Sequence, residues 1–336
     1  METKLLGTSR RDIIEAASLL KAGEVVAVPT ETVYGLAANA FDEAAVRKIF
    51  SAKMRPCDNP LIVHISSLDM LKMAAVSLPR TAIACADAFW PGPLTMVLPK
   101  RREIPYVTSG GLETVGIRFP SDRICQSIIS ECGFPLAAPS ANLSGSPSPT
   151  NAKRVYEDMN GRISAIVDGG ESMVGLESTV ISFEGDSVRI LRPGRISYDD
   201  LLAVAKRVII DSGVTQKVDN DKPAASPGMK YRHYAPKARV ILIDSDLEAF
   251  RSYVQKNSTE GSYCLLFSDG EAIEGMPYLT YGADGETQAH LLFERLRQFD
   301  ELGAATIFAR CPSQDGVGLA VYNRILRSSG FNIVKL

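Results

Sequence analysis

Residues 51–64 read Ser-Ala-Lys-Met-Arg-Pro-Cys-Asp-Asn-Pro-Leu-Ile-Val-His, and this stretch joins a predicted helix to a predicted strand. It places Lys53, Arg55, Asn59 and His64 around two prolines, whose rings restrict the connecting backbone. Arginine presents a rigid fork of donors that suits phosphate or carboxylate, and lysine adds a mobile point charge. The stretch therefore predicts an anion site, and the phosphates of a nucleotide would suit it.

Lys53 and Arg55 by themselves do not require a ligand, because two cations near a helix end commonly lie on a solvated face and favour the negative end of the helix dipole. Further polar clusters outweigh that interpretation, since each lies at the end of a short apolar run. They are Thr30-Glu31-Thr32-Val33-Tyr34-Gly35, Arg118 after Val-Gly-Ile, Pro139-Ser140-Ala141-Asn142-Leu143-Ser144-Gly145, Ser178-Thr179 and Arg192. We expect these clusters to converge on one site.

The elements around the opening stretch alternate irregularly. Asp42 is expected to cap a helix whose last turn carries Lys53, and residues 61–65 form the next strand. Further strands are predicted at residues 25–28, 94–98, 115–119, 136–138, 165–167, 179–183 and 188–191, and further helices at residues 11–24, 79–89, 122–132, 151–159 and 198–208. This mixture indicates a mixed sheet flanked by helices rather than a regular βαβ repeat.

A change of composition divides the chain. From residue 211 to residue 227 the apolar periodicity gives way to Asp, Ser, Gly, Lys, Asn and Pro, which is typical of a linker. Strands at 239–243, 263–267 and 306–309 then alternate with helices at 247–256, 288–302 and 317–327. We predict an α/β (α+β) protein of three parts: a mixed-sheet domain at 1–210, a linker at 211–238, and a smaller parallel, Rossmann-like domain at 239–336.

Composition limits the functional classes. The 336 residues are 45% apolar and 23% charged, which allows two substantial cores, and the net charge of −2 with a pI near 6.0 argues against a surface coated with basic residues. Six cysteines without a Cys-x-x-Cys pair, and three histidines, argue against a structural zinc site. The N-terminus lacks a signal-peptide core and no apolar run approaches the ~18 residues of a membrane helix, so we expect a cytoplasmic protein without membrane contact.

The motifs resemble those of the threonylcarbamoyl-adenylate synthases of the Sua5/YrdC/YwlC type, and the similarity covers nearly the whole chain. It includes residues 29–35, 53–64, 91–98, 115–119, 139–145, 175–181, 191–194 and the string Ser-Pro-Gly-Met-Lys-Tyr-Arg-His-Tyr-Ala-Pro at 226–236. That string and the long segment after it are typical of the two-domain members. The resemblance implies an open, strongly twisted, YrdC-like sheet with a concave face.

The resemblance also implies an activity. Such an L-threonylcarbamoyladenylate synthase is a nucleotidyltransferase: it condenses L-threonine, bicarbonate or CO2, and ATP into threonylcarbamoyl-AMP and pyrophosphate, with Mg²⁺ carried by the ATP phosphates rather than by a protein metal site. The product would pass to a downstream tRNA threonylcarbamoyltransferase complex, which modifies the adenosine next to the anticodon in tRNAs reading codons that begin with A. Contact with tRNA or other double-stranded RNA would have to be local.

The family pattern assigns the polar residues to two substrates. The positions associated with ATP are Arg55, Asn59, Thr114, Ser140, Asn142, Ser148, Arg192 and Tyr234, and those associated with L-threonine are Thr32, His64, Arg118, the backbone at Ala138, and Ser178. Lys53 and Arg55 are the predicted catalytic cations, with Lys53 directed at the phosphates or the carbamate. An arginine can bind the amino acid's carboxylate bidentately, and hydroxyl and imidazole groups can recognise the threonine hydroxyl.

Each of these motifs also has a structural interpretation. A histidine within Leu-Ile-Val-His-Ile is often a core imidazole bonded to backbone, and a Ser/Pro/Gly-rich stretch before a helix capped by Thr150 is often a plain loop. Residues 226–236 are either a strap that docks the domains or a lid that brings Tyr234 to the nucleotide. Glu31 and Asp58 are nearby carboxylates for magnesium or proton transfer, and Asp122 stands where many family members have histidine.

Two other functions are open. An RNA-binding or ribosome-maturation module could use Lys100, Arg101, Arg102, Lys153 and Arg154 on a concave sheet and would need neither ATP nor threonine. The carbamoyl-transfer domain used in hydrogenase maturation is a third alternative, but that architecture carries cysteine-paired zinc modules that this sequence lacks.

Overall fold

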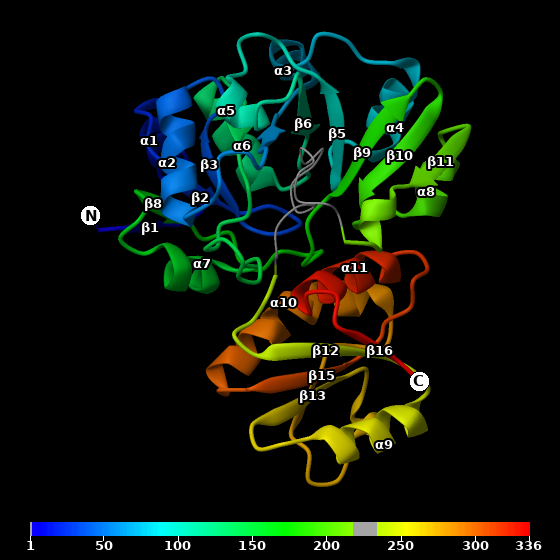
Figure 1. Cartoon of the computed structure of the whole chain (residues 1–336). Helices are drawn as coiled ribbons and strands as arrows, with labels where there is room; N and C mark the ends of the chain where they lie inside the picture. The colour runs from blue at the N-terminus through cyan, green and yellow to red at the C-terminus, as the bar shows by residue number, and fades with distance from the viewer. Residues whose placement is uncertain (1, 218–233) are drawn as a thin grey trace. The chain divides into compact units, whose positions relative to one another are not determined.

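The computed structural model describes residues 2–217 and 234–336 (Figure 1). Two compact units divide the chain: the first comprises Met1–Ser144 and Ser148–Lys230, and the second comprises Gly145–Pro147 and Tyr231–Leu336. The short segment Gly145–Pro147 is joined to the second unit by hydrogen bonds from the amide of Ala235 to the Gly145 carbonyl and from Arg297 Nη2 to the Pro147 carbonyl. Each unit is described below by itself.

The first unit is built on one mixed sheet of eleven strands in the order β1-β8-β2-β3-β7-β4-β6-β5-β9-β10-β11. Parallel pairs such as β4/β6 and β5/β9 are interspersed with antiparallel pairs such as β5/β6 and β9/β10, as the fold prediction requires. The strands are β1 Lys4–Leu6, β2 Val26–Val28, β3 Gly35–Asn39, β4 Ile62–His64, β5 Leu94–Pro99, β6 Thr114–Arg118, β7 Leu136–Ala137, β8 Ala165–Val167, β9 Thr179–Glu184, β10 Ser187–Arg192 and β11 Arg207–Ile210.

Helices cover both faces of this sheet. Successive side chains along a strand point to opposite faces, so one strand can contribute apolar residues to both cores. Val26 and Val28 of β2 pack with the apolar sides of α1 and α6, whereas Val25 and Ala27 belong to the core on the opposite face, which includes α2. The helices are α1 Arg10–Lys21, α2 Glu43–Lys53, α3 Leu68–Ala74, α4 Arg80–Phe89, α5 Tyr106–Ser109, α6 Arg123–Cys132, α7 Ala152–Met159 and α8 Tyr198–Leu202.

The second unit is a parallel sheet with helices, which confirms the predicted small α/β fold. Its five strands have the order β14-β13-β15-β12-β16, and every adjacent pair is parallel. The strands are β12 Arg239–Asp244, β13 Ser262–Leu266, β14 Tyr278–Thr280, β15 Thr306–Arg310 and β16 Ile333–Lys335, and the helices are α9 Leu247–Asn257, α10 Gly285–Glu301 and α11 Gly318–Ser328.

Local chemistry fixes the helix that ends at Lys53. The Asp42 side chain accepts hydrogen bonds from the amides of Ala44 and Ala45, so Asp42 is the predicted N-cap of α2. Met54 follows in the left-handed conformation, with φ of 54°, and this ends the helix directly after Lys53. The opening stretch of the sequence therefore turns sharply at the point where its cations lie.

Three local predictions are wrong. Residues 198–208 do not form one helix: α8 ends at Leu202, and Arg207–Ile210 is the edge strand β11, because Val208 finds a buried place beside β10. Asn151, not Thr150, caps α7, since its side chain accepts from the Arg154 amide. Strand β3 was not predicted, because the small residues of Gly35–Asn39 show no β-branched or aromatic pattern.

The structure describes only part of the predicted linker. Ser212–Val214 forms a single 3₁₀ turn in which Gly213 and Val214 are buried, so the chain after β11 is still packed against the first unit there. Residues 218–233, which carry most of the 226–236 motif, lie outside the described residues. The domain bounds 1–210, 211–238 and 239–336 stay predictions.

Candidate active site

A single register line crosses five adjacent strands of the first unit. His64 of β4 lies opposite Arg118 of β6, Arg118 opposite Thr95 of β5, Thr95 opposite Val180 of β9, and Val180 opposite Arg192 of β10. Residues opposite one another on paired strands share a face of the sheet, so side chains from distant parts of the sequence are neighbours there. We call this set (His64, Arg118, Thr95, Val180 and Arg192) the strand row.

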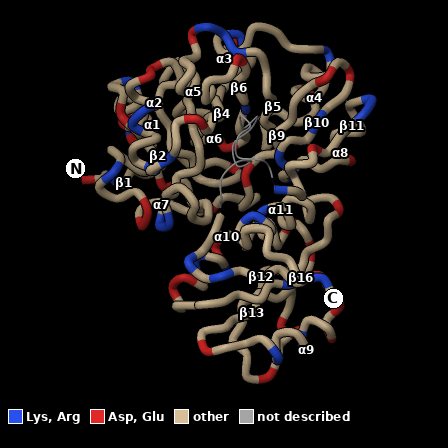
Figure 2. Tube along the Cα trace, viewed as in Figure 1, with Lys and Arg blue, Asp and Glu red and all other residues tan. Residues whose placement is uncertain are grey.

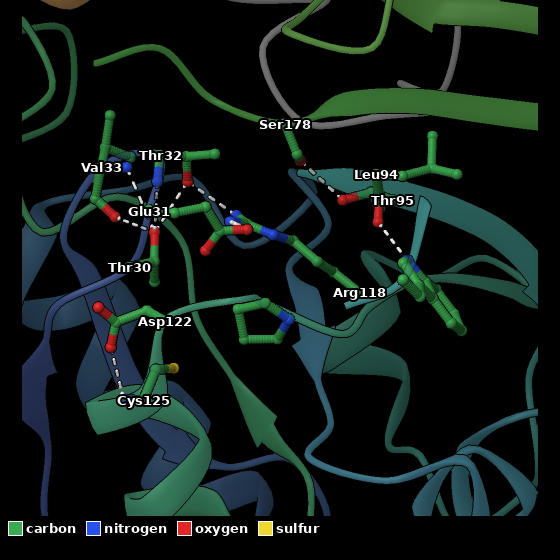
Figure 3. A network of polar contacts seen from close by, with 12 residues as sticks. Thr30, Glu31, Thr32, Val33, Leu94, Thr95, Arg118, Asp122, Cys125 and Ser178 are labelled. Atoms are coloured by element: carbon green, nitrogen blue, oxygen red, sulfur yellow. Dashed lines mark hydrogen bonds and ion pairs between the residues drawn. The ribbon is translucent and has the colours of Figure 1, made fainter. Parts of the chain in front are cut away.

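Arg118 reaches from the strand row to the loop that carries Glu31 and Thr32 (Figure 3). Its Nη1 donates to Thr32 Oγ1 at 2.8 Å, and its Nη2 lies 2.8 Å from Glu31 Oε1. Both side chains of this ion pair are about nineteen-twentieths buried, at 5% and 3% exposure. Thr30 fixes the loop, because its hydroxyl accepts from the amides of Thr32 and Val33.

The Arg118–Glu31 pair is close but incompletely bonded. Arg118 Nε and Nη2 and both carboxylate oxygens of Glu31 are buried without hydrogen-bond geometry to any described group. Leaving such atoms unbonded in a protein interior is costly, so they are rare except where a ligand or water completes them. The Nε–Nη2 edge of a guanidinium is also the edge that binds a carboxylate bidentately.

Ser178 joins the strand row from the loop before β9. Its hydroxyl lies 2.7 Å from Thr95 Oγ1, and Arg192 donates both to that hydroxyl, from Nη2 at 3.2 Å, and to the Ser178 carbonyl, from Nε at 3.1 Å. A β-bulge between Ile190 and Arg192 aims the arginine at this loop. Gly194 makes room for it, because a Cβ there would lie 2.4 Å from the Thr179 amide nitrogen.

His64 is a buried neutral imidazole beside Arg118. Its pKa is lowered to about 3, mainly by burial in the sheet and also by the positive charge of Arg118, while a hydrogen bond to the Ile62 carbonyl opposes the shift. Its Nδ1 lies 3.2 Å from that carbonyl oxygen. The contact fits the structural interpretation of this residue, and its place next to Arg118 fits the proposed threonine role; a neutral imidazole can do both.

The Lys53 ammonium group binds backbone carbonyl oxygens of a neighbouring loop. Its ammonium, on a side chain only 1% exposed, donates to the Ser140 carbonyl, to the Asn142 carbonyl at 2.6 Å and to Asn142 Oδ1 at 3.4 Å. The amide of Ser144 in turn donates to the Lys53 carbonyl at 2.9 Å. We call Lys53 with the loop residues Ser140, Asn142 and Ser144 the loop clamp. The cation therefore holds the predicted phosphate-binding loop, and direct contact with phosphate stays a prediction.

The remaining residues of the opening stretch lie around the start of β4. Arg55 Nη2 donates to the carbonyls of Asn59 and Pro60, at 3.4 and 3.1 Å. Asn59 is buried, and its Oδ1 has no hydrogen-bond partner among the described residues. Thr114 begins β6, and continuing the β4/β6 register places it beside Pro60. Arg55, Asn59 and Thr114 are thus brought near one another, four to five residues along the strands from the strand row.

Three further residues predicted to bind substrate make contacts with other parts of the protein. The Ser148 hydroxyl donates to the buried carboxylate of Glu177, and the Ala138 amide donates to the Ile62 carbonyl at 2.9 Å. Tyr234 belongs to the second unit, where its ring stacks on Phe293 at 5.2 Å between centroids and lies 5.4 Å from the Arg324 guanidinium. Tyr234 has a φ of 63°, which is uncommon for a non-glycine residue. The ligand roles of all three stay predictions.

The structure adds Thr95, which the sequence did not single out, and shows the position of Asp122 beside the site. Thr95 links Arg118 to Ser178, but an isolated threonine in a strand gives no sequence signal. Asp122 caps α6 by accepting from the Cys125 amide at 2.7 Å and faces the Glu31 side of the site (Figure 3). Burial raises the pKa of Asp122, and the negative charge of Glu31 adds to the rise, while the hydrogen bond from Cys125 opposes it.

Within residues 2–217 and 234–336, no group of three or more His, Cys, Asp or Glu side chains could hold a metal ion. All six cysteines are free thiols, and burial raises the pKa of Cys125 far above its usual range. No helix in the described part of the chain combines the length and the apolar character needed to cross a membrane.

Comparison with known proteins places this site in a family. Residues 18–194 match the family model described as "Telomere recombination", and residues 196–330 match the model described as "Threonylcarbamoyl-AMP synthase, C-terminal domain". The threonylcarbamoyl-AMP synthase of Pyrococcus abyssi is 44% identical over 96% of this chain and 95% of its own length. This chain belongs to the threonylcarbamoyl-AMP synthase family. Its members are nucleotidyltransferase enzymes.

Other relatives agree with that assignment. The Bacillus subtilis threonylcarbamoyl-AMP synthase is 42% identical over 99% of this chain and 97% of its own length. The crystal structure of P. abyssi Sua5 complexed with L-threonine superposes with a TM-score of 0.93 at 42% identity, and covers 99% of this chain and 100% of the other. Both domains that the two family models describe are therefore matched in this chain.

Proposed function

We propose that this protein condenses L-threonine, bicarbonate or CO2, and ATP into threonylcarbamoyl-AMP and pyrophosphate. The observation that carries the proposal is the buried Arg118 of the strand row, whose Nε and Nη2 have no hydrogen bond to the described residues and which has the hydroxyls of Thr32, Thr95 and Ser178 nearby. A guanidinium edge for a carboxylate, surrounded by hydroxyl groups, is what recognition of a polar amino acid requires. The crystallised P. abyssi relative binds L-threonine.

The proposed chemistry joins the amino acid to a nucleotide. The threonine amine and bicarbonate form a carbamate, whose carboxylate attacks the α-phosphorus of ATP, and pyrophosphate leaves from the opposite side. Arg55 and Arg192 would stabilise the charge that develops on the phosphoryl oxygens, and the loop clamp would hold the backbone of the phosphate-binding loop. Mg²⁺ bound to the ATP phosphates supplies further charge neutralisation.

The wider role follows from the product. Threonylcarbamoyl-AMP is a labile mixed anhydride, so a second enzyme must consume it, and we propose the tRNA threonylcarbamoyltransferase complex. That complex transfers the group to the adenosine next to the anticodon in tRNAs that read codons beginning with A. The protein would then act in the cytoplasm, where ATP, free threonine and tRNA occur together.

A binding module for RNA is less well supported. Lys100 is 8% exposed and donates to the Ile104 carbonyl, and Arg154 is buried against Glu157 at 2.9 Å. Only part of the predicted basic cluster therefore faces solvent. Figure 2 shows acidic residues interspersed with basic ones along both units. Neither observation provides the continuous basic face that non-specific RNA binding needs.

The test is a pyrophosphate-release assay on the full chain with ATP, Mg²⁺ and bicarbonate, with and without L-threonine. We expect release that depends on threonine, and a product with the mass of threonylcarbamoyl-AMP. Serine and valine serve as matched controls, because each lacks one of the two groups on the threonine β-carbon. Release that ignores threonine, or no release at all, would contradict the proposal and favour the binding module.

A further inference from the structure

Glu31 is a buried carboxylate that the proposed chemistry has not yet used. It is 4% exposed, and both of its oxygens lack hydrogen-bond geometry to any group in the described chain. Its one close partner is the Arg118 guanidinium, at 2.8 Å. The ion pair with Arg118 explains why a negative charge is tolerated at Glu31. It does not explain why both carboxylate oxygens are buried without a hydrogen bond to the described residues.

A free amino acid completes this arrangement. It is a zwitterion, with a carboxylate and an ammonium group on neighbouring atoms, and Arg118 and Glu31 present the opposite charges side by side. A carboxylate on the Arg118 Nε–Nη2 edge places the ammonium within reach of Glu31, whose carboxylate points toward the same guanidinium (Figure 3). The Thr32 hydroxyl, held by Arg118 Nη1, borders the same space.

The reaction needs a base at this point. At neutral pH the amine of an amino acid is protonated and cannot attack carbon, so a proton must leave before the carbamate forms. We propose that Glu31 accepts this proton from the substrate ammonium. The inference rests on the proposed function. With bicarbonate as co-substrate the step balances: ammonium, bicarbonate and the Glu31 carboxylate give carbamate, one water and the protonated Glu31.

The charged and titratable groups around Glu31 support a proton acceptor there. Arg118 of β6 supplies one positive charge, and His64 of β4, next to Arg118, is a neutral imidazole. Burial raises the pKa of Asp122 and of Cys125, at the start of α6, and the negative charge of Glu31 adds to both rises. Within the described residues Glu31 is the carboxylate with both oxygens buried and unbonded, while one oxygen of Asp122 is committed to its helix cap.

The test compares Glu31→Gln with wild type by kcat/KM for threonine between about pH 6.5 and 8.5, the range in which an α-amino group begins to lose its proton. Glutamine keeps the shape and an acceptor for Arg118 but takes up no proton. We expect a loss of about 100-fold at pH 7, in the range of a general base. The loss should shrink by nearly tenfold per pH unit, because free neutral amine replaces the missing base.

Asp122→Asn is the matched control, since asparagine still caps α6. Any loss of kcat/KM in this variant is expected to be the same factor at every pH. If Glu31→Gln loses the same factor at every pH, Glu31 only positions Arg118 and the inference is overturned. It is equally overturned if Asp122→Asn shows the pH-dependent recovery, or if Glu31→Gln is as active as wild type.

Two further outcomes, an inactive wild-type protein and a Glu31→Gln variant that does not fold, have to be distinguished from the results above. A wild-type chain without threonine-dependent pyrophosphate release refutes the proposed function itself, and the Glu31 comparison then has no basis. If Glu31→Gln does not fold, Glu31→Asp replaces it: this variant keeps the carboxylate but withdraws it by one methylene. We then expect about tenfold lower kcat/KM with the wild-type pH profile, and a profile that rises steeply with pH would overturn the inference.

Discussion

The strand row and the loop clamp both place a buried cation at the site, but the two cations are bonded in opposite ways. Lys53 in the loop clamp directs its ammonium at carbonyl oxygens of the Ser140–Asn142 loop and at an amide oxygen of that loop. Arg118 in the strand row donates to Thr32 and faces Glu31, yet its Nε and Nη2 atoms have no hydrogen bond. The Lys53 ammonium is hydrogen-bonded within the protein, whereas two nitrogens of the Arg118 guanidinium have no hydrogen bond to the described residues.

The difference shows that formal charge does not define a role. Lysine carries a compact charge that three backbone or amide oxygens can satisfy, so it is suited to fastening a loop. Arginine has five donors in a plane, and two donor nitrogens of Arg118, Nε and Nη2, are buried without a hydrogen bond to the described residues. We therefore expect substitutions at His64, Arg118 and Thr95 of the strand row to affect threonine binding, and substitutions in the loop clamp to affect the loop and nucleotide binding.

Arg118→Lys is expected to have the largest effect. It keeps the positive charge beside Glu31 but removes the bidentate edge, so threonine affinity should fall by about 100-fold, which corresponds to about 2.7 kcal/mol. Calorimetric titration with L-threonine measures this, and titration with ATP is the control that should change little. Threonine affinity within threefold of wild type would mean that charge alone suffices, and the comparison would fail.

Gly194→Ala tests the packing that positions Ser178. The new Cβ would lie 2.4 Å from the Thr179 amide nitrogen and 2.7 Å from the Ser178 carbonyl carbon, and backbone atoms cannot move aside cheaply. We expect a loss of up to about 3 kcal/mol in the free energy of unfolding, together with weaker threonine binding. Urea unfolding provides the measurement. Gly270→Ala is the control, because a Cβ there meets only Ser268 Oγ at 3.7 Å.

Lys53→Met tests the loop clamp. Methionine fills similar space but leaves buried carbonyls unbonded, so we expect a loss of about 2 kcal/mol in stability and faster hydrogen exchange of the Ser144 amide. ATP should bind more weakly while threonine affinity changes less. Lys48→Met, on the same helix but exposed, is the matched control. Unchanged exchange at the loop would show that the clamp does not hold it.

His64→Gln has the smallest effect at neutral pH and the clearest dependence on acid. The folded-state pKa of His64 is about 3, below the usual 6.5, so between these values the unfolded chain binds a proton that the native protein does not. Wild-type stability therefore falls by about 1.4 kcal/mol per pH unit as the pH drops through this window, and this part is absent from the variant. The measurement is the free energy of unfolding of both proteins at pH 7, 6 and 5. If the difference between wild type and variant is the same at all three pH values, His64 is accessible to protons in the native protein and the prediction is wrong.

His64→Ala addresses its ligand role separately. If the imidazole lines the amino-acid site beside Arg118, the KM for threonine should rise about tenfold or more while the KM for ATP changes little, as for loss of a polar contact to one substrate. Equal changes in both KM values would assign His64 to the core alone.

The sequence predicted well where a pattern is local. The cap at Asp42 is set by neighbouring atoms, and it is present as expected. Elements with strong apolar patterns, such as β8 and α9, were predicted nearly to the residue. The predictions failed at β3 and β11, whose strand character depends on pairing with partners far away in the chain. Propensity is a weak guide at such positions.

The candidate site divides in the same way. Its residue types, and their grouping at strand ends, could be found in the sequence because arginine, threonine and serine after short apolar runs are visible there. The bonding of Lys53 to its loop, the link through Thr95, and the bare oxygens of Glu31 could not. Each of them depends on which atoms the strands bring within about 3 Å, and side-chain types alone do not encode that distance.

The sequence by itself determined the family motifs, the order of the two family domains and local features such as the Asp42 cap, because these rest on local chemistry and on spacing along the chain. Only the tertiary structure decided that His64, Arg118, Thr95 and Arg192 form one row. Strand register and one β-bulge set that alignment, and both are fixed by pairing between residues that are 12 (Val180 and Arg192) to 85 (Thr95 and Val180) positions apart in the chain.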